Sequence, residues 1–150
     1  MIRGQLSHSC ASQQYANPAV VVPGITVGDT HGTFHPRSWE GLIDTGSDRT
    51  IIPEGVATQL DITPVGFALL SSFDKSQAPK YCPEYDVHLA VPGLDELVSL
   101  TACGAPRPSI LLGRDFLSMF LLIVDGSVSR WGLTAASLLS RLSLFLVGMR

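Results

Sequence analysis

The chain has 150 residues, which is enough for one domain with a hydrophobic core of ordinary size. Its formal net charge is −3, from 10 basic and 13 acidic residues, and no basic stripe runs along it, so we expect no nucleic-acid partner. Three scattered cysteines and the lack of a run of ~20 apolar residues predict free thiols, no membrane contact and a cytoplasmic location.

The first third of the chain is predicted to hold a loose end followed by short strands. Residues 1–17 are polar and without period, which predicts a flexible N-terminal arm. A β-branched run at 19–22 stops at a Pro-Gly pair, and a second run at 25–27 is followed by turn-forming residues. The extended pattern resumes at 39–43 and predicts a hairpin whose second strand leads directly to Asp44.

The rest of the chain alternates strand patterns with short helical ones. The long stretch 65–91 predicts two strands around a polar, turn-rich centre. Helical spacing predicts short helices, and β-rich runs predict further strands. The expected helices cover 54–62, 114–120 and 133–147, and the expected strands cover 50–53, 98–104, 109–113 and 121–126. Many short strands with frequent turns indicate a mostly β, closed, barrel-like domain with one to three short helices.

Two segments carry the chemistry. GLIDTGSDRTIIP, residues 41–53, places Asp44 directly behind an apolar strand and in front of a turn made by Thr45 and Gly46. ILLGRDFL, residues 110–117, repeats the order of apolar run, glycine and charge. Gly46 permits close backbone approach and turn dihedrals that are closed to other residues. Taken alone, Asp44 is better explained as an aspartate that ends a strand in an ordinary turn, and the second motif is what favours a catalytic role.

The order of these two motifs resembles the retropepsin-type aspartic proteases, the half-size relatives of pepsin. Asp-Thr-Gly occurs once in the chain, so the resemblance implies a homodimer with a catalytic pair made of Asp44 from each copy. It also implies a polypeptide substrate and a reaction in which two carboxylates share one proton and activate a water. No cofactor and no metal are expected, because His31 and His35 lack an evident third ligand.

The resemblance implies further roles around Asp44. The Thr45 hydroxyl would bond across the two-fold axis, Asp48 would hold the substrate backbone, and Arg114 would pair with Asp48. Ile110, Leu111 and Leu112 would form the strand beside the catalytic loop, with Gly113 allowing tight packing. The tip of a substrate-covering flap would contain Phe73, Asp74 and Lys75, although no glycine lies between Gly66 and Gly93, where flaps of this family carry them.

The implied domain plan is an arm at 1–17, a protease domain at 18–132 and a helical extension at 133–150. Three alternatives remain open. Asp48 and Arg114 can form a purely structural ion pair. The chain can be a non-catalytic dimerisation or peptide-binding module of the same fold. It can also be a protease that needs a partner or removal of the arm.

Overall fold

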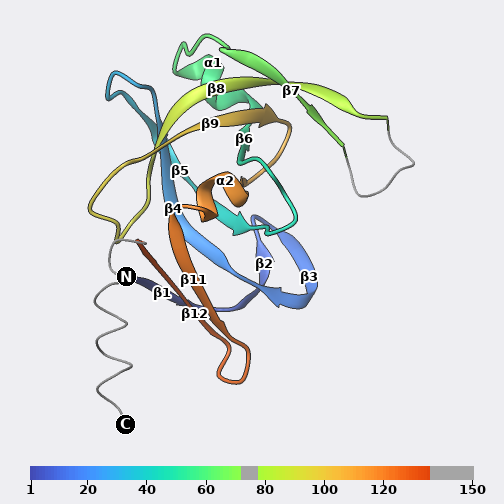
Figure 1. The fold of residues 1–150 in the computed structure, drawn as a ribbon, viewed down its shortest axis with the longest axis vertical. Helices are drawn as coiled ribbons and strands as arrows, with labels where there is room; N and C mark the ends of the chain where they lie inside the picture. The colour runs from blue at the N-terminus through green and yellow to red at the C-terminus, as the bar shows by residue number, and fades with distance from the viewer. Residues whose placement is uncertain (72–77, 136–150) are drawn as a thin grey trace.

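The computed structural model describes residues 1–71 and 78–135 (Figure 1). Within these ranges the chain forms short strands and two short helices. The helices are α1 (Glu54–Gln59) and α2 (Arg114–Leu117). The strands are β1 (Ile2–Gln5), β2 (Ser7–Cys10), β3 (Gln13–Ala19), β4 (Val21–Gly28), β5 (Phe34–Ile43), β6 (Ile51–Pro53), β7 (Gly66–Leu70), β8 (Lys80–Ala90), β9 (Val98–Ala105), β10 (Ile110–Leu112), β11 (Phe120–Asp125) and β12 (Arg130–Ala135).

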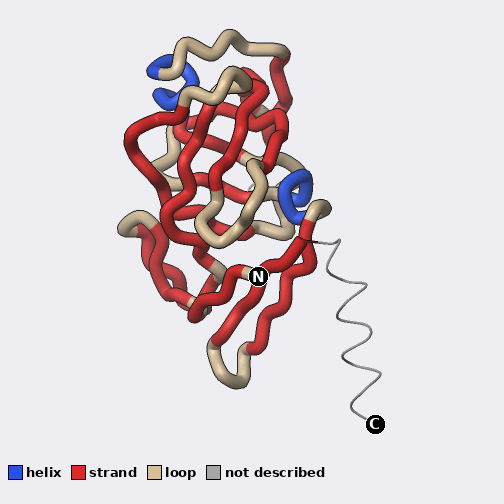
Figure 2. Tube along the Cα trace, turned by 90° about the vertical axis from the view of Figure 1, so that its left-hand side faces the viewer, coloured by secondary structure: helices blue, strands red, loops and turns tan. Residues whose placement is uncertain are grey.

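The largest sheet closes on itself into a barrel. Its strand order is β4-β5-β10-β6-β9-β8-β7, and β4 also pairs antiparallel with β8. The ring is therefore β4, β5, β10, β6, β9 and β8, while β7 continues outside it on the edge of β8 (Figure 1). Closure removes the free edges of all the other strands of this sheet. Figure 2 shows how strands make up most of the described chain. The predicted fold class, a mostly β, barrel-like domain with short helices, is confirmed.

The barrel is filled by the inward-facing side chains of its strands, together with those of the helices. Ile25 of β4, Leu89 of β8 and Leu112 of β10 are fully buried in one cluster, and Phe116 of α2 joins it from the side. Each such side chain contributes ~1.5–3 kcal/mol when it leaves water. Apolar residues on alternate strand positions thus explain why these short segments stay extended.

Strand β4 corrects one sequence prediction. The two β-branched runs were expected to be separated at Pro23-Gly24, but the structure has one continuous strand with a register shift between Val22 and Ile25. Pro23 is exposed and Gly24 has a positive φ of +73°, so the irregularity absorbs both residues without ending the strand.

The N-terminal segment corrects a second prediction, because residues expected to form a loose arm are ordered strands. β1 pairs with β12, and β2 pairs with β3. Ile2 packs against the core, and the Trp131 indole donates a hydrogen bond to the Gln5 carbonyl at 3.1 Å. A Cβ on Gly4 would lie 2.6 Å from the Trp131 ring, so this glycine lets β1 pass over the indole. The prediction was wrong because pairing with a distant strand replaces the missing local pattern.

The C-terminal helix prediction is wrong where it can be compared. Residues 133–135 belong to β12, in which Leu133 pairs with Ile2 on one side and Leu122 on the other. Leu133 is fully buried by these neighbours, which outweighs its helical spacing with later leucines. The remainder of the predicted extension, 136–150, lies outside the described residues. No helix in the described part of the chain is long and apolar enough to cross a membrane.

Candidate active site

The loop after β5 begins with Asp44, and the neighbouring strand β10 positions it. β10 runs parallel to β5 with Leu112 opposite Ile43, and the Asp44 N–H donates to the Leu112 carbonyl at 3.0 Å. The Asp44 carboxylate accepts the Gly46 N–H at 2.9 Å through Oδ1. The carboxylate is therefore held at the end of the two strands while remaining partly exposed. The strand expected beside this loop, Ile110–Leu112, is present.

The tip of the loop is open to solvent. Thr45 and Gly46 are both exposed, and the Ser47 N–H returns to the Asp44 carbonyl at 3.2 Å to close the turn. Thr45 makes no side-chain hydrogen bond within residues 1–71 and 78–135. Its hydroxyl is thus available to a group from outside the described chain.

The second motif packs directly against the loop. A Cβ on Gly113 would lie 2.4 Å from the Arg49 carbonyl oxygen, which no side chain tolerates. Next to it, the Arg114 N–H donates to the Ser47 carbonyl at 2.8 Å. The tight packing predicted for Gly113 is therefore present, and it brings the two sequence motifs into one structural unit.

A buried polar network, missed by the sequence analysis, ties the two motifs together. Asp115 accepts the Thr50 N–H at 2.9 Å, the Thr50 hydroxyl at 2.7 Å and the Phe116 N–H at 2.7 Å. Thr50 is fully buried, and its hydroxyl oxygen also accepts the Gly113 N–H at 3.2 Å. An aspartate in the first turn of a helix is the signal that pointed to such a role, because carboxylates there accept free backbone N–H groups.

Asp48 and Arg114 form the predicted ion pair on the outside of the loop, through Asp48 Oδ1 and Arg114 Nη2. The side chains are 74% and 63% exposed, so their mutual attraction is screened by water. The pair orients the Asp48 carboxylate beside the loop and adds little to stability.

A groove of about 460 Å³ runs between this loop and the hairpin formed by β7 and β8. The loop contributes Gly46 to Arg49, and the hairpin contributes residues 67–71 and Glu84. Arg49 Nη2 lies 3.2 Å from Glu84 Oε1, which joins the loop to β8 across the groove. Phe67 and Leu69 of β7 are exposed, so an apolar surface borders this charged pair.

A small apolar cluster lies behind the same region, outside the main core. Its buried members are Ile51, Cys103 and Leu111, and Leu42 packs against them. Burial, followed by the charge of Glu84, raises the pKa of the Cys103 thiol to about 11. Cys103 therefore behaves as a small apolar side chain in the buried cluster behind the loop.

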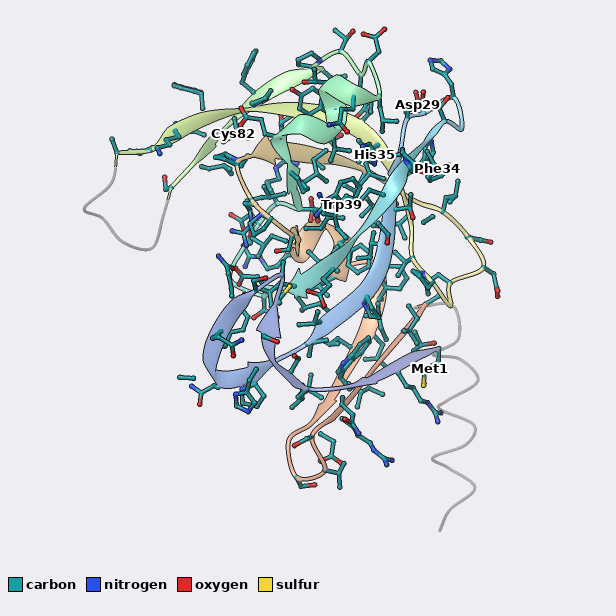
Figure 3. All side chains as sticks on the ribbon, turned by 180° about the vertical axis from the view of Figure 1, so that it is seen from behind. Met1, Asp29, Phe34, His35, Trp39 and Cys82 are labelled. Carbon is teal, nitrogen blue, oxygen red and sulfur yellow. The ribbon has the colours of Figure 1, made fainter. Side chains whose placement is uncertain are left out.

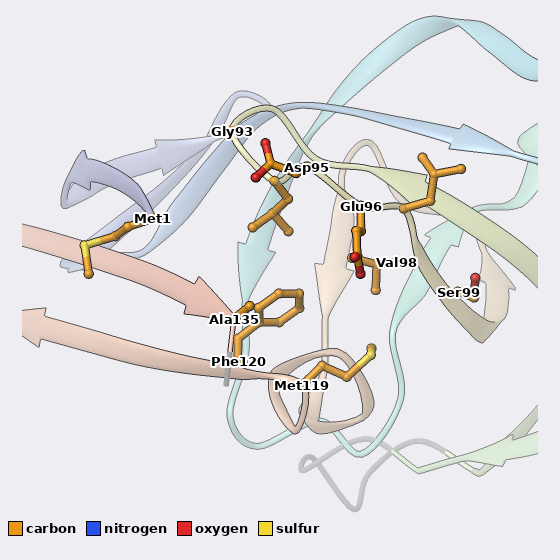
Figure 4. A pocket seen from close by; sticks show the side chains of 11 residues that line it. Met1, Gly93, Asp95, Glu96, Val98, Ser99, Met119, Phe120 and Ala135 are labelled. Carbon is orange, nitrogen blue, oxygen red and sulfur yellow. The ribbon is translucent and has the colours of Figure 1, made fainter. Parts of the chain in front are cut away.

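The predicted flap corresponds to the β7–β8 hairpin, whose described pairing ends at Leu70 opposite Lys80. Phe73, Asp74 and Lys75, the expected tip, lie outside the described residues. Another cavity, of about 580 Å³, lies elsewhere, between residues 93–99 and the start of β11, with Met119 and Phe120 on one wall (Figure 4). It contains no residue of the Asp44 loop, so we do not place the candidate active site there.

No family model matches the sequence, and no curated protein matches it. Among solved structures, the chain is similar to the foamy viral protease-reverse transcriptase bound to an RNA/DNA hybrid, with a TM-score of 0.48 and 19% identity over 71% of this chain and 13% of that chain. It is also similar to the EIAV protease in complex with an inhibitor, with a TM-score of 0.46 and 16% identity over 71% of this chain and 91% of that chain. The chain thus spans only a small part of the foamy viral protease-reverse transcriptase and most of the EIAV protease.

Proposed function

We propose that the protein is an aspartic endopeptidase whose active site is formed by the Asp44 carboxylates of two identical chains. The observation that carries this proposal is the placement of Asp44. Backbone contacts with Leu112 and Gly46 fix the carboxylate at an open loop, and that loop borders a groove beneath a hairpin. The carboxylate is fixed two residues before Gly46, the first loop residue that lines the groove, so a chain bound in the groove would pass close to it.

The chemistry requires a second carboxylate. Two carboxyl groups ~3 Å apart cannot both ionise, so the pair holds one proton and has both a base and an acid. The ionised Asp44 takes a proton from water as the water attacks the peptide carbonyl. The protonated Asp44 hydrogen-bonds the carbonyl oxygen and then protonates the leaving nitrogen. This mechanism needs no cofactor.

Dimerisation supplies that second carboxylate in the simplest way. The chain has one Asp-Thr-Gly, and its turn is exposed rather than covered by other parts of the described chain. A two-fold contact at the turn brings each loop against its own copy, so that the two Asp44 side chains meet. The exposed Thr45 hydroxyl is then placed to bond the partner loop.

The substrate we propose is a polypeptide lying in the groove between the loop and the β7–β8 hairpin. The Asp48 carboxylate, oriented by Arg114, is available to accept a substrate backbone N–H. Apolar side chains of the substrate would contact Phe67 and Leu69, which are exposed at the groove.

The first test replaces Asp44 by Asn, which keeps the shape of the side chain and removes its charge. Cleavage of a diverse peptide mixture, read by mass spectrometry from pH 3 to 7, is expected for the wild type and absent for the variant. Sizing should give a dimer for both. Retained cleavage by Asp44→Asn would contradict the proposal.

A mixing experiment tests whether two chains share one site. Wild type and Asp44→Asn are unfolded together and refolded at varied ratios. If each site needs both Asp44 residues, the activity should fall with the square of the wild-type fraction. A linear fall would show that each chain carries its own complete site. A folded dimer that binds peptides without cleaving them would instead support a non-catalytic module, the reading favoured by the glycine-poor hairpin.

A further inference from the structure

A second, smaller pocket lies near the other end of β5, away from the Asp44 loop. It has a volume of about 200 Å³. We call it the β5 pocket, and define it by the side chains of His35, Arg37, Trp39, Gln59 and Arg107. Trp39 precedes Asp44 by five residues of extended chain, which corresponds to ~16 Å along the strand. The pocket shares no residue with the groove at the candidate active site.

Strand geometry explains how three of these side chains meet. His35, Arg37 and Trp39 are alternate residues of β5, so they share one face of the strand. The His35 and Trp39 rings have centroids 4.8 Å apart, and the Arg37 guanidinium lies 5.5 Å from the Trp39 ring centroid. Figure 3 shows His35 and Trp39 together on this strand. The indole is buried, so it serves as the floor on which the other two are placed.

The hydrogen bonds of His35 identify the source of the positive charge. Its Nδ1 accepts the Arg37 N–H at 3.0 Å, which leaves the proton on Nε2, and Nε2 donates to the Gln59 side-chain oxygen. Both nitrogens of the imidazole are thus in use within the chain. The charge of the pocket therefore comes from the guanidinium groups of Arg37 and Arg107.

Neither guanidinium has a carboxylate partner within the described residues, although the chain as a whole is negative. The pocket has no acidic side chain in its lining. Glu40, next to Trp39 on β5, accepts the Ala11 N–H; its charge and that of Arg107 both act on Cys10, but the two side chains form no ion pair. Arg107 Nε is shielded from solvent and has no hydrogen-bond partner in the described structure. A buried donor without an acceptor is costly, and an oxyanion toward which the Arg107 guanidinium turns would remove that cost.

We propose that the β5 pocket binds the phosphate group of a phosphomonoester. A phosphomonoester carries a charge of about −1.5 to −2 near pH 7, which matches two unpaired guanidinium groups, whereas a carboxylate carries only one charge. The guanidinium group of an arginine can also donate two parallel hydrogen bonds to two oxygens of one phosphate. The phosphate can belong to a small ester or to a phosphorylated protein side chain, since both present the same group. This site is independent of the proposed peptidase activity.

The two tryptophans of the chain provide the readout. In protein labelled with ¹⁵N-tryptophan, the indole signal of Trp39 reports the pocket, while that of Trp131, under β1, reports the fold. Two probes are titrated: phenyl phosphate, and a phosphotyrosine peptide beside its unphosphorylated form. We expect a saturable shift of the Trp39 signal alone, with no response to the unphosphorylated peptide. Equal affinity for both phosphorylated probes identifies a small ester as sufficient, and tighter binding of the phosphopeptide identifies a protein source.

Variants test which residues bind the phosphate. Arg37→Gln and Arg107→Gln should each weaken binding by about tenfold or more, as expected for loss of a charged hydrogen bond. Arg37→Lys keeps the positive charge but loses the forked guanidinium, so its affinity for the probes should lie between those of the wild type and Arg37→Gln. Arg130→Gln changes an exposed arginine on β12 and should bind as the wild type does. The proposal is overturned if neither probe shifts the Trp39 signal. It is also overturned if the probes bind with equal affinity to Arg37→Gln, Arg107→Gln and Arg130→Gln while the Trp131 signal shows that all three variants are folded.

Discussion

Single residues in the two motifs differ in what they do, even when their chemistry is the same. Asp48 and Asp115 are both aspartates within a few residues of the glycines that shape the site. Asp48 points to solvent and pairs with an exposed arginine, whereas Asp115 accepts three hydrogen bonds inside the fold. The first is therefore available to a ligand, and the second is a structural clamp.

Replacing Asp115 by Ala should lower the free energy of unfolding by ~2–4 kcal/mol. The change leaves the N–H of fully buried Thr50 without an acceptor and removes the acceptor of its hydroxyl, and unsatisfied buried groups of this kind cost ~1–3 kcal/mol each. Urea unfolding followed by fluorescence gives the value. Asp48→Asn is the matched control, with an expected loss below ~1 kcal/mol because its ion pair is exposed. Equal losses for the two variants would show that the network is not a clamp.

The sequence located the catalytic candidate but not this clamp. Asp44 is recognisable because its neighbours in the chain, an apolar strand and a Thr-Gly turn, form a local pattern. Of the hydrogen bonds to Asp115, only the one from the Phe116 N–H is local, and an aspartate in the first turn of a helix predicts that one alone. The two bonds from Thr50 come from 65 residues away in the chain, so no local pattern reports them. The role assigned to Asp48 and Arg114 came from the resemblance alone, and their contact in the structure is consistent with it.

At the level of elements, the contact between the loop and β10 depends on the absence of one side chain. Gly113→Ala places a Cβ against the Arg49 backbone, which cannot rotate away as a side chain would. We expect the free energy of unfolding to fall by ~1–3 kcal/mol from this overpacking. On the proposed function, we also expect peptidase activity to fall further than stability alone explains, because the displaced backbone carries the loop that holds Asp44.

Gly126→Ala is the control for this prediction. Gly126 lies in the turn between β11 and β12, and a Cβ there would meet nothing within 4 Å. The free energy of unfolding of the Gly126→Ala variant, measured by chemical denaturation, should differ from that of the wild type by less than ~0.5 kcal/mol. If both alanine variants behave alike, the close approach at Gly113 has no energetic consequence.

The sequence predicted most elements of the barrel because each is short and its apolar residues alternate or cluster locally. The helices near 54–62 and 114–120, and the hairpin that delivers Asp44, are of this kind. The prediction was wrong in two regions for the same reason. β1 has only one apolar residue that packs on the core, and Leu133 has helical spacing, yet both are extended because they pair with each other. Strand pairing between the two ends of a chain is invisible to a local pattern.

At the level of the whole molecule, the N-terminal segment decides between two views of the protein. If residues 1–17 were a loose arm, their removal could uncover an interface and activate the enzyme. In the structure β1 is instead the edge strand that covers β12, with Ile2 opposite Leu133 and the Gln5 carbonyl bound to the Trp131 indole. Removal would expose Leu133 and Trp131, both now buried.

Deleting residues 1–5 should therefore destabilise the protein rather than activate it. Exposing two large apolar side chains and losing one strand pairing should cost at least ~3 kcal/mol of unfolding free energy. Thermal or urea unfolding, together with the peptide-cleavage assay, measures both consequences. Arg3→Ala is the control, because Arg3 is exposed and its loss keeps the strand. If the truncated chain is as stable as this control and cleaves peptides faster than the wild type, the prediction is wrong and the segment inhibits cleavage. Deleting an element that only supports the sheet would not raise the rate of cleavage.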